Sequence, residues 1–244
     1  MNFPEPGDYI DIHNHGAEPA PGVFTVDTLM AHEERVPENI KGLTFSFGIH
    51  PWYLDEKNHG ELIDRVIKNA GNPDIAAIGE AGFDRLKGPS PELQTKTFEE
   101  QVLIAEEKKK PLVIHCVRAW DDLLREYKRL RPKMPWLVHG FRGKPDLAQQ
   151  LVSKGIYLSF WFDFVMRPES VPLLKSVPKE RIFLETDGAE IDIKGIYNKV
   201  SIDLGLTVEG LKTIIYKNFN VFFAPKSRQS GTYEVRMQNN RITK

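Results

Sequence analysis

The chain has 244 residues, and its 33 basic and 34 acidic side chains leave a formal net charge of −1. This balance excludes the global positive field that attracts nucleic acid, so any contact with nucleic acid has to be local. The single cysteine, Cys116, excludes an internal disulfide and is typical of a reducing compartment. The chain shows no signal-peptide pattern and no apolar run near the ~20 residues of a membrane helix, so we expect a cytoplasmic protein with no membrane partner.

Short apolar runs predict eight β-strands. The first follows Tyr9, and the others are expected at residues 23–26, 43–49, 75–79, 112–114, 136–138, 156–160 and 182–184. Apolar residues at helical spacing, with capping residues such as Ser90 and Thr207, predict helices between most of these strands. The helices are expected at residues 27–36, 61–69, 91–109, 121–131 and 145–154, after Pro168, and after Thr207.

This alternation is typical of a parallel sheet, and eight units indicate a closed (β/α)8 TIM barrel, an α/β fold. An open, doubly wound sheet is the alternative. A barrel of about 250 residues forms a single domain. We therefore expect one barrel in residues 1–223 and a C-terminal tail, residues 224–244, whose role the sequence leaves open.

Side chains that bind metal ions stand where predicted strands end. Residues two apart in a strand project to the same face, so the first strand directs two imidazoles, His13 and His15, at one point. Four more candidates follow at later strand ends: Glu80, His115, His139 and Asp187. The carboxyl ends of barrel strands carry the active site, so we expect all six side chains to converge there.

Four histidines and two carboxylates exceed the needs of one tetrahedral ion, so the sequence predicts two divalent ions. In two-metal hydrolases the ions lie about 3.5–4 Å apart, close enough for one carboxylate to bridge them. We assign the bridge to Glu80, because its strand lies between the histidines of the first strand and those of the fifth and sixth. Nitrogen and carboxylate ligands suit zinc, manganese, iron or magnesium, with magnesium the least suited to four imidazoles.

Six motifs resemble the TatD family of metal-dependent deoxyribonucleases, within the amidohydrolase superfamily of barrels. They are Asp11-Ile12-His13-Asn14-His15, Gly48-Ile49-His50-Pro51, the run from Ile78 to Asp84, Val113-Ile114-His115, Val138-His139-Gly140-Phe141 and Leu184-Glu185-Thr186-Asp187. The resemblance implies a binuclear site that cleaves phosphodiesters, with DNA or a small phosphodiester as substrate. It also implies that Asp187 helps to activate the attacking water.

The chain departs from the family pattern at three places. Gly140 and Arg142 stand where family members often carry a cysteine and a serine, and Gly188 to Glu190 replace a small residue and a proline. The segment between the first two motifs is also short. These departures leave the metal ligands intact but leave the substrate open.

Other residues near the strand ends are candidates for substrate contacts. Arg118, three residues beyond His115, has the planar guanidinium that clamps a phosphate, and we assign it a catalytic role; Arg142 is the rival for this role. His50 is expected to bind substrate, with a structural His-Pro turn as the alternative. The aromatic run from Trp161 to Phe164 is expected to form core or a lid rather than a platform for bases.

Three functions remain open from the sequence. The first is a TatD-like nuclease, and the second is an amide or ester hydrolase on the same barrel, because fold and metals do not fix the bond that is cleaved. The third is a metal-bound interaction module, which is disfavoured because no seventh ligand closes the site. The oligomeric state is open as well, and a monomer is compatible with the sequence.

Overall fold

The structure, a computed structural model that describes residues 2–224, is built around one sheet of eight strands. Each strand pairs in parallel with the next one along the chain. The strands are β1 (Tyr9–Asn14), β2 (Val23–Met30), β3 (Leu43–Gly48), β4 (Ile75–Asp84), β5 (Leu112–Val117), β6 (Trp136–Val138), β7 (Tyr157–Trp161) and β8 (Ile182–Glu185). The predicted single-domain (β/α)8 barrel is confirmed, and the open sheet is not formed.

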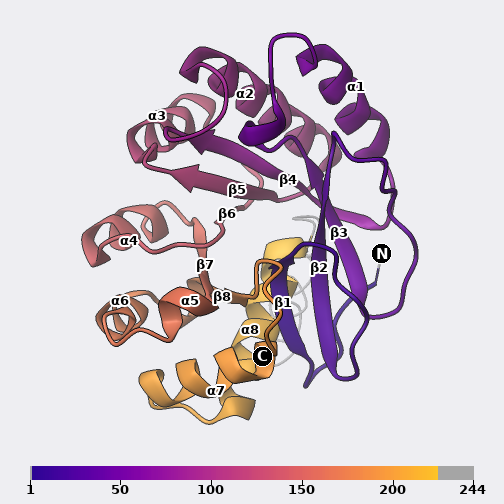
Figure 1. Ribbon diagram of the computed structural model, residues 1–244. Coiled ribbons are helices and arrows are strands. Elements are labelled where there is room, and N and C mark those ends of the chain that lie inside the picture. The colour runs from indigo at the N-terminus through magenta and orange to yellow at the C-terminus, as the bar shows by residue number, and fades with distance from the viewer. Residues whose placement is uncertain (1, 225–244) are drawn as a thin grey trace, which may run out of the picture.

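Helices surround the sheet and connect most of the strands (Figure 1). They are α1 (His59–Asn69), α2 (Pro91–Lys108), α3 (Trp120–Leu130), α4 (Pro145–Val152), α5 (Phe162–Val165), α6 (Ser170–Ser176), α7 (Ile193–Leu204) and α8 (Val208–Phe223), with 3-10 turns at Pro51–Tyr53 and Lys179–Arg181. The side chains of Ser90 and Thr207 accept hydrogen bonds from the N–H groups of Leu93 and Gly210, so both predicted helix starts are confirmed. Within residues 2–224, no helix combines the length and apolar character needed to cross a bilayer.

The helix predicted at residues 27–36 is wrong. Residues 27–30 belong to β2, which pairs with β3 in an unbroken register from Thr25 to Met30. The β-branched residues Val23, Val26 and Thr28 favour a strand, and pairing with β3 extends it beyond the four residues expected. Neither the β1–β2 nor the β2–β3 connection contains a helix, and the three strands follow one another directly in Figure 1.

The last helix covers the part of the barrel that these connections leave without helices. α8 packs on β2 through Phe219, whose ring centroid lies 5.4 Å from that of Phe24. Phe3, from the segment before β1, packs against Phe219 at 6.2 Å. The chain therefore covers its first strands with residues from its two ends, and Phe24 and Phe219 are both fully buried.

The barrel closes between β1 and β8, and a side chain takes part in the closure. The hydroxyl of Tyr197, in α7, accepts a hydrogen bond from the Ile10 N–H and donates one to the Ile10 carbonyl, each over 3.0 Å. At the carboxyl end of the two strands, the Asp187 N–H donates to the His13 carbonyl over 3.1 Å. These contacts satisfy backbone groups that a buried strand cannot leave unpaired.

The domain boundary predicted at residue 223 stays a prediction. Residues 225–244, which make up nearly all of the predicted C-terminal tail, lie outside the part of the chain that the structure describes.

Candidate metal centre

All six side chains predicted to bind metal lie together at the carboxyl end of the barrel. Glu80 is at their centre, and each of its oxygens faces a different pair of imidazoles. Oε1 lies 2.9 Å from Nδ1 of His115 and 2.7 Å from Nε2 of His139. Oε2 lies 3.4 Å from Nε2 of His13 and 3.6 Å from Nε2 of His15.

Asp187 joins the pair from β1. Its Oδ1 lies 3.5 Å from Nε2 of His13 and 3.5 Å from Nε2 of His15. Burial differs across the set: the side chains of His13 and Glu80 are enclosed, whereas those of His15 and Asp187 are 34% and 29% exposed. The group formed by His13, His15 and Asp187 is therefore the part of the cluster that a substrate can reach from solvent.

Local backbone structure brings Glu80 against β5. Gly82, two residues further along β4, has a φ of +151°, which favours glycine over any other residue. A Cβ atom at this position would lie 1.9 Å from the carbonyl oxygen of His115. The lack of a side chain at Gly82 therefore allows β4 and β5 to approach closely, and this approach places Glu80 beside His115.

The carboxylates and imidazoles of the cluster shift one another's pKa values. Burial opposes ionisation of Glu80, but the neighbouring His139, with His115 and His13, outweighs it and lowers the pKa of Glu80 well below its usual value. Burial and the charge of His139 oppose protonation of His13, but Asp187 and Glu80 outweigh them and raise its pKa to about 9. The donor set therefore combines ionised carboxylates with basic imidazoles, which suits divalent cations.

Carboxylates lie on the far side of two of the rings. The Nε2 of His115 lies within hydrogen-bond distance of Oδ2 of Asp84, at 3.0 Å, whereas the Nδ1 of His139 lies 3.4 Å from Oε1 of Glu185 without forming a hydrogen bond. An imidazole whose outer nitrogen donates to a carboxylate can turn the lone pair of its inner nitrogen toward a cation. The buried Nε2 of His13 forms no hydrogen bond within residues 2–224, although two carboxylates lie near it. The residues present therefore fit a metal centre.

His50 has the opposite arrangement. Its Nε2 also points into the cluster, 3.2 Å from Oε1 of Glu80 and 3.2 Å from Nδ1 of His115. Its Nδ1, however, accepts a hydrogen bond from the backbone N–H of Trp52 over 3.0 Å. A neutral imidazole whose Nδ1 accepts must carry its proton on Nε2, so His50 presents a donor to the cluster and not a lone pair. Burial lowers the pKa of His50 and favours this neutral form.

The two candidate arginines lie beside the cluster and not within it. Arg118 and Arg142 line an adjoining hollow together with Trp161, and both are exposed. Trp161 ends β7, and Phe162 begins the short helix α5, where Val165 is buried. Among the residues that the structure describes, neither arginine forms an ion pair or a hydrogen bond.

Sequence reasoning missed the carboxylates that orient the histidines. Asp84 ends β4, on the same face as Glu80, and the N–H groups of Leu86 and Lys87 and of the Trp52 indole donate to it. Glu185 is fully buried at the end of β8 and accepts a hydrogen bond from the hydroxyl of Ser159. The even spacing of Asp84 from Glu80 within β4 was a signal that could have found Asp84.

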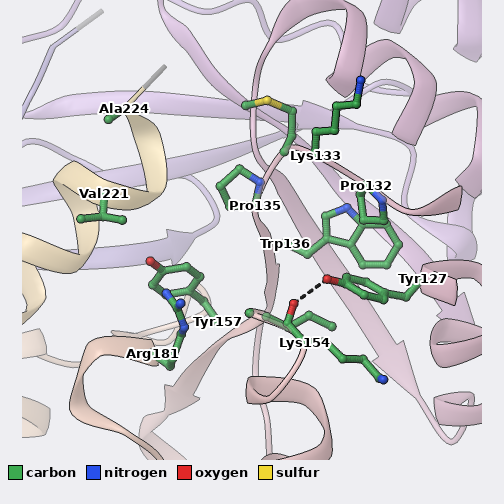
Figure 2. Close-up of a pocket in the computed structure, with 13 residues that line it drawn as sticks. Tyr127, Pro132, Lys133, Pro135, Trp136, Lys154, Tyr157, Arg181, Val221 and Ala224 are labelled. Carbon is green, nitrogen blue, oxygen red and sulfur yellow. Dashed lines mark hydrogen bonds between the residues drawn. The ribbon is translucent and has the colours of Figure 1, made fainter. Parts of the chain in front are cut away.

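A separate hollow lies at the opposite end of the barrel from the metal centre and is chemically different. Its volume is about 330 Å³, and it is bordered by the starts of β6 and β7, with Trp136 and Tyr157 (Figure 2). Its charged lining residues are Lys133, Lys154 and Arg181, with no acid and no histidine among the described residues. It therefore offers no metal ligands, and the catalytic candidate remains the cluster around Glu80.

Residues 20–224 match the family model of the TatD-related DNases, which covers most of the chain. The chain is 32% identical over 145 residues to the 3'-5' ssDNA/RNA exonuclease TatD of Citrobacter koseri. That alignment covers 57% of this chain and 55% of the relative, so the chain matches little more than half of that protein's length. It is also 29% identical over 187 residues to an uncharacterised metal-dependent hydrolase of Buchnera aphidicola, with 72% of this chain and 70% of that protein covered.

The fold has close counterparts among solved structures. The crystal structure of YjjV, a TatD homologue from Escherichia coli, superposes with a TM-score of 0.77 at 20% identity, covering 88% of this chain and 97% of that chain. A TatD-family hydrolase from Entamoeba histolytica superposes with a TM-score of 0.70 at 18% identity, covering 90% and 99%. At these sequence identities the superpositions support the barrel fold and nothing further.

Proposed function

Because the chain belongs to the family of TatD-related DNases, we propose that it is a metal-dependent nuclease that hydrolyses phosphodiester bonds. The observation that carries the proposal is the position of Glu80, whose two oxygens face two separate pairs of imidazoles. Two divalent ions would be held by Glu80 between them, one with His13, His15 and Asp187 and the other with His115 and His139. Zinc, manganese, iron and magnesium are all compatible with these ligands.

When bound here, divalent ions would act as Lewis acids toward a phosphoryl oxygen and would lower the pKa of water to about 7. The chain's own residues place and move the protons. Asp187 is partly exposed, and His13 and His15 outweigh its burial and lower its pKa, so it is ionised and able to accept a proton from the attacking water. The Nε2–H of His50 is aimed at the same space and is suited to donate to an oxygen of the phosphodiester.

An amide or ester hydrolase on the same barrel remains the alternative. No contact in the described residues favours it, whereas the named functions of the curated relatives concern nucleic acid. A phosphodiester also brings a negative charge that matches the unpaired arginines beside the cluster, and a neutral amide does not.

The test is a substrate screen of metal-loaded protein. Bis(4-nitrophenyl) phosphate, a nitroanilide, and a short single-stranded DNA should be offered in the presence of zinc, manganese or magnesium, and again after treatment with EDTA. We expect hydrolysis of the diester and the DNA that EDTA abolishes and metal restores. Hydrolysis of the nitroanilide alone would establish the amide alternative in its place.

A further inference from the structure

Two hollows meet over the metal centre. The first has a volume of about 390 Å³, and its lining includes Met30 and Tyr53. The second has a volume of about 580 Å³ and extends over the ends of β5, β6 and β7. Both are lined by Trp52, His115, His139 and Asp187. A molecule that lies across the centre therefore has one part in each hollow, and both volumes lie within the roughly 300–1,000 Å³ range of small-ligand sites.

The two hollows differ in charge. The second hollow contains Arg118 and Arg142, and its acid among the described residues is Asp187 of the metal centre. Among residues 2–224, the lining of the first hollow includes no arginine or lysine. A phosphate beyond the scissile one therefore finds guanidinium donors on one side of the centre and none on the other.

Both guanidinium groups are available to a ligand. Arg35, Arg85 and Arg129 form ion pairs with neighbouring acids, whereas the two arginines of the second hollow pair with no acid in residues 2–224. The guanidinium carbon of Arg142 lies 5.5 Å from the ring centroid of Trp161, and this contact holds the side chain without using its N–H donors. The guanidinium of Arg118 has no hydrogen-bond partner in the described part of the chain.

We infer that the second hollow is a subsite for the phosphate group next to the one that is cleaved, with Arg118 and Arg142 as its donors. We call it the arginine subsite. A planar guanidinium binds a phosphate through two parallel hydrogen bonds, and two such groups from adjacent strand ends, β5 and β6, can enclose one phosphate. The inference rests on the proposed function and specifies it: the strand continues over β5–β7, and the nucleoside on the other side of the scissile bond occupies the first hollow.

The experiment compares three small substrates that differ by one phosphate. They are a thymidine dinucleotide without terminal phosphate, the same dinucleotide with a 5'-phosphate, and the same dinucleotide with a 3'-phosphate. For the wild-type holoenzyme, we expect one of the two terminal phosphates, and not both, to raise kcat/KM by about tenfold or more, in line with charged hydrogen bonds. Arg118→Ala and Arg142→Ala should each remove most of that gain.

A matched control is available in Arg131. Like Arg118, it is an exposed arginine with a left-handed backbone, φ 49° against 51°, but it caps the C-terminus of α3 at the other end of the barrel. Arg131→Ala should keep the full gain from the terminal phosphate. Metal content, measured by elemental analysis, should be the same in wild type and in all three variants.

The outcomes separate the inference from the proposed function. An equal gain from both terminal phosphates, or from neither, overturns the arginine subsite while hydrolysis of the dinucleotide upholds the nuclease. A loss in Arg118→Ala that is as large on the unphosphorylated dinucleotide also overturns it, because the arginine then acts on the scissile phosphate. If the metal-loaded protein hydrolyses none of the three and no nitrophenyl diester, the proposed function fails and the subsite with it.

Discussion

The Nε2 atom of His115 lies 3.0 Å from Oδ2 of Asp84, and the same oxygen accepts a hydrogen bond from the Trp52 indole over 2.7 Å. The carboxylate therefore orients the ring of His115, whose Nδ1 faces Oε1 of Glu80. Partners of this kind typically contribute 10–100-fold to metal affinity. We expect Asp84→Asn to weaken binding of the ion held by His115 and His139 by about this factor, measured by competition with a chromophoric chelator. Asp121→Asn, an exposed acid at the start of α3, should change nothing. Equal metal affinity in Asp84→Asn and wild type would show that Asp84 does not support the metal centre.

Glu80→Gln tests the bridge. Glutamine keeps the size of the side chain but removes the negative charge that holds two cations close together. Metal content should fall from about two equivalents to one or fewer, and diester hydrolysis should fall with it. Elemental analysis after mild loading and gel filtration measures the first quantity, and circular dichroism controls for folding. A variant that retains two equivalents and full turnover would show that Glu80 is structural.

His50→Ala tests the donor assignment. Because Nδ1 of His50 accepts from the Trp52 N–H, the residue cannot offer a lone pair to a metal without losing that bond. Metal content should therefore stay at the wild-type level, while turnover falls by about ten- to a hundredfold for the loss of a hydrogen bond to a charged group. Nitrogen NMR of the wild-type protein should find the proton of His50 on Nε2. A loss of metal in the variant would make His50 a ligand.

Metal binding should release protons near neutral pH. The pKa of His13 is raised to about 9 in the metal-free protein, so its Nε2 is protonated at pH 7 and must lose that proton to bind a cation. Metal affinity should therefore increase as pH rises toward 9. The stability of the metal-free protein changes with pH in the opposite direction. The raised pKa of His13 adds to the free energy of unfolding at pH values below the ordinary histidine pKa of 6.5, and this contribution is lost as pH rises through about 9. A pH indicator in weak buffer measures the release, and an absence of released protons at pH 7 would contradict the raised pKa.

Tyr197→Phe should weaken the closure of the barrel. The change removes the hydroxyl that serves both the N–H and the carbonyl of Ile10 and leaves these buried groups without that partner. The free energy of unfolding should fall by about 1–3 kcal/mol, measured by urea denaturation. Tyr53→Phe, at a ring that is 45% exposed, should cost less than about 0.5 kcal/mol. Equal losses in the two variants would mean that the hydroxyl of Tyr197 contributes nothing specific.

Much of the fold was predictable because buried parallel strands leave short apolar runs that end in polar residues. His115 and His139 follow such runs directly, and both lie where expected. The error at residues 27–36 has a tertiary cause, since pairing with β3 decides the conformation of Thr28 to Met30. α7 was missed although its signals are local: Asp192 caps it, and Ile193, Ile196, Tyr197 and Val200 recur at helical spacing.

The six ligand candidates could be predicted, whereas the residues that orient them could be found only in part. Glu185 gains its role from Ser159 and His139, which come from other strands, so no local pattern reveals it. The direction of His50 depends on one backbone N–H, that of Trp52, and a sequence cannot place a proton on one nitrogen or the other. The charge difference between the two hollows likewise appears only when the strand ends are assembled.

The closure of the barrel brings residues from the two ends of the described chain into one cluster. His13 and Asp187 are separated by nearly the whole barrel in sequence, yet their side chains lie 3.5 Å apart. During synthesis the N-terminus leaves the ribosome first. His13 and His15 in β1 therefore have no Asp187 beside them until β8 and the residues after it have been translated. A nascent or truncated chain that ends before Asp187 lacks this partner. Hydrolytic activity should therefore arise only once the complete barrel has left the ribosome.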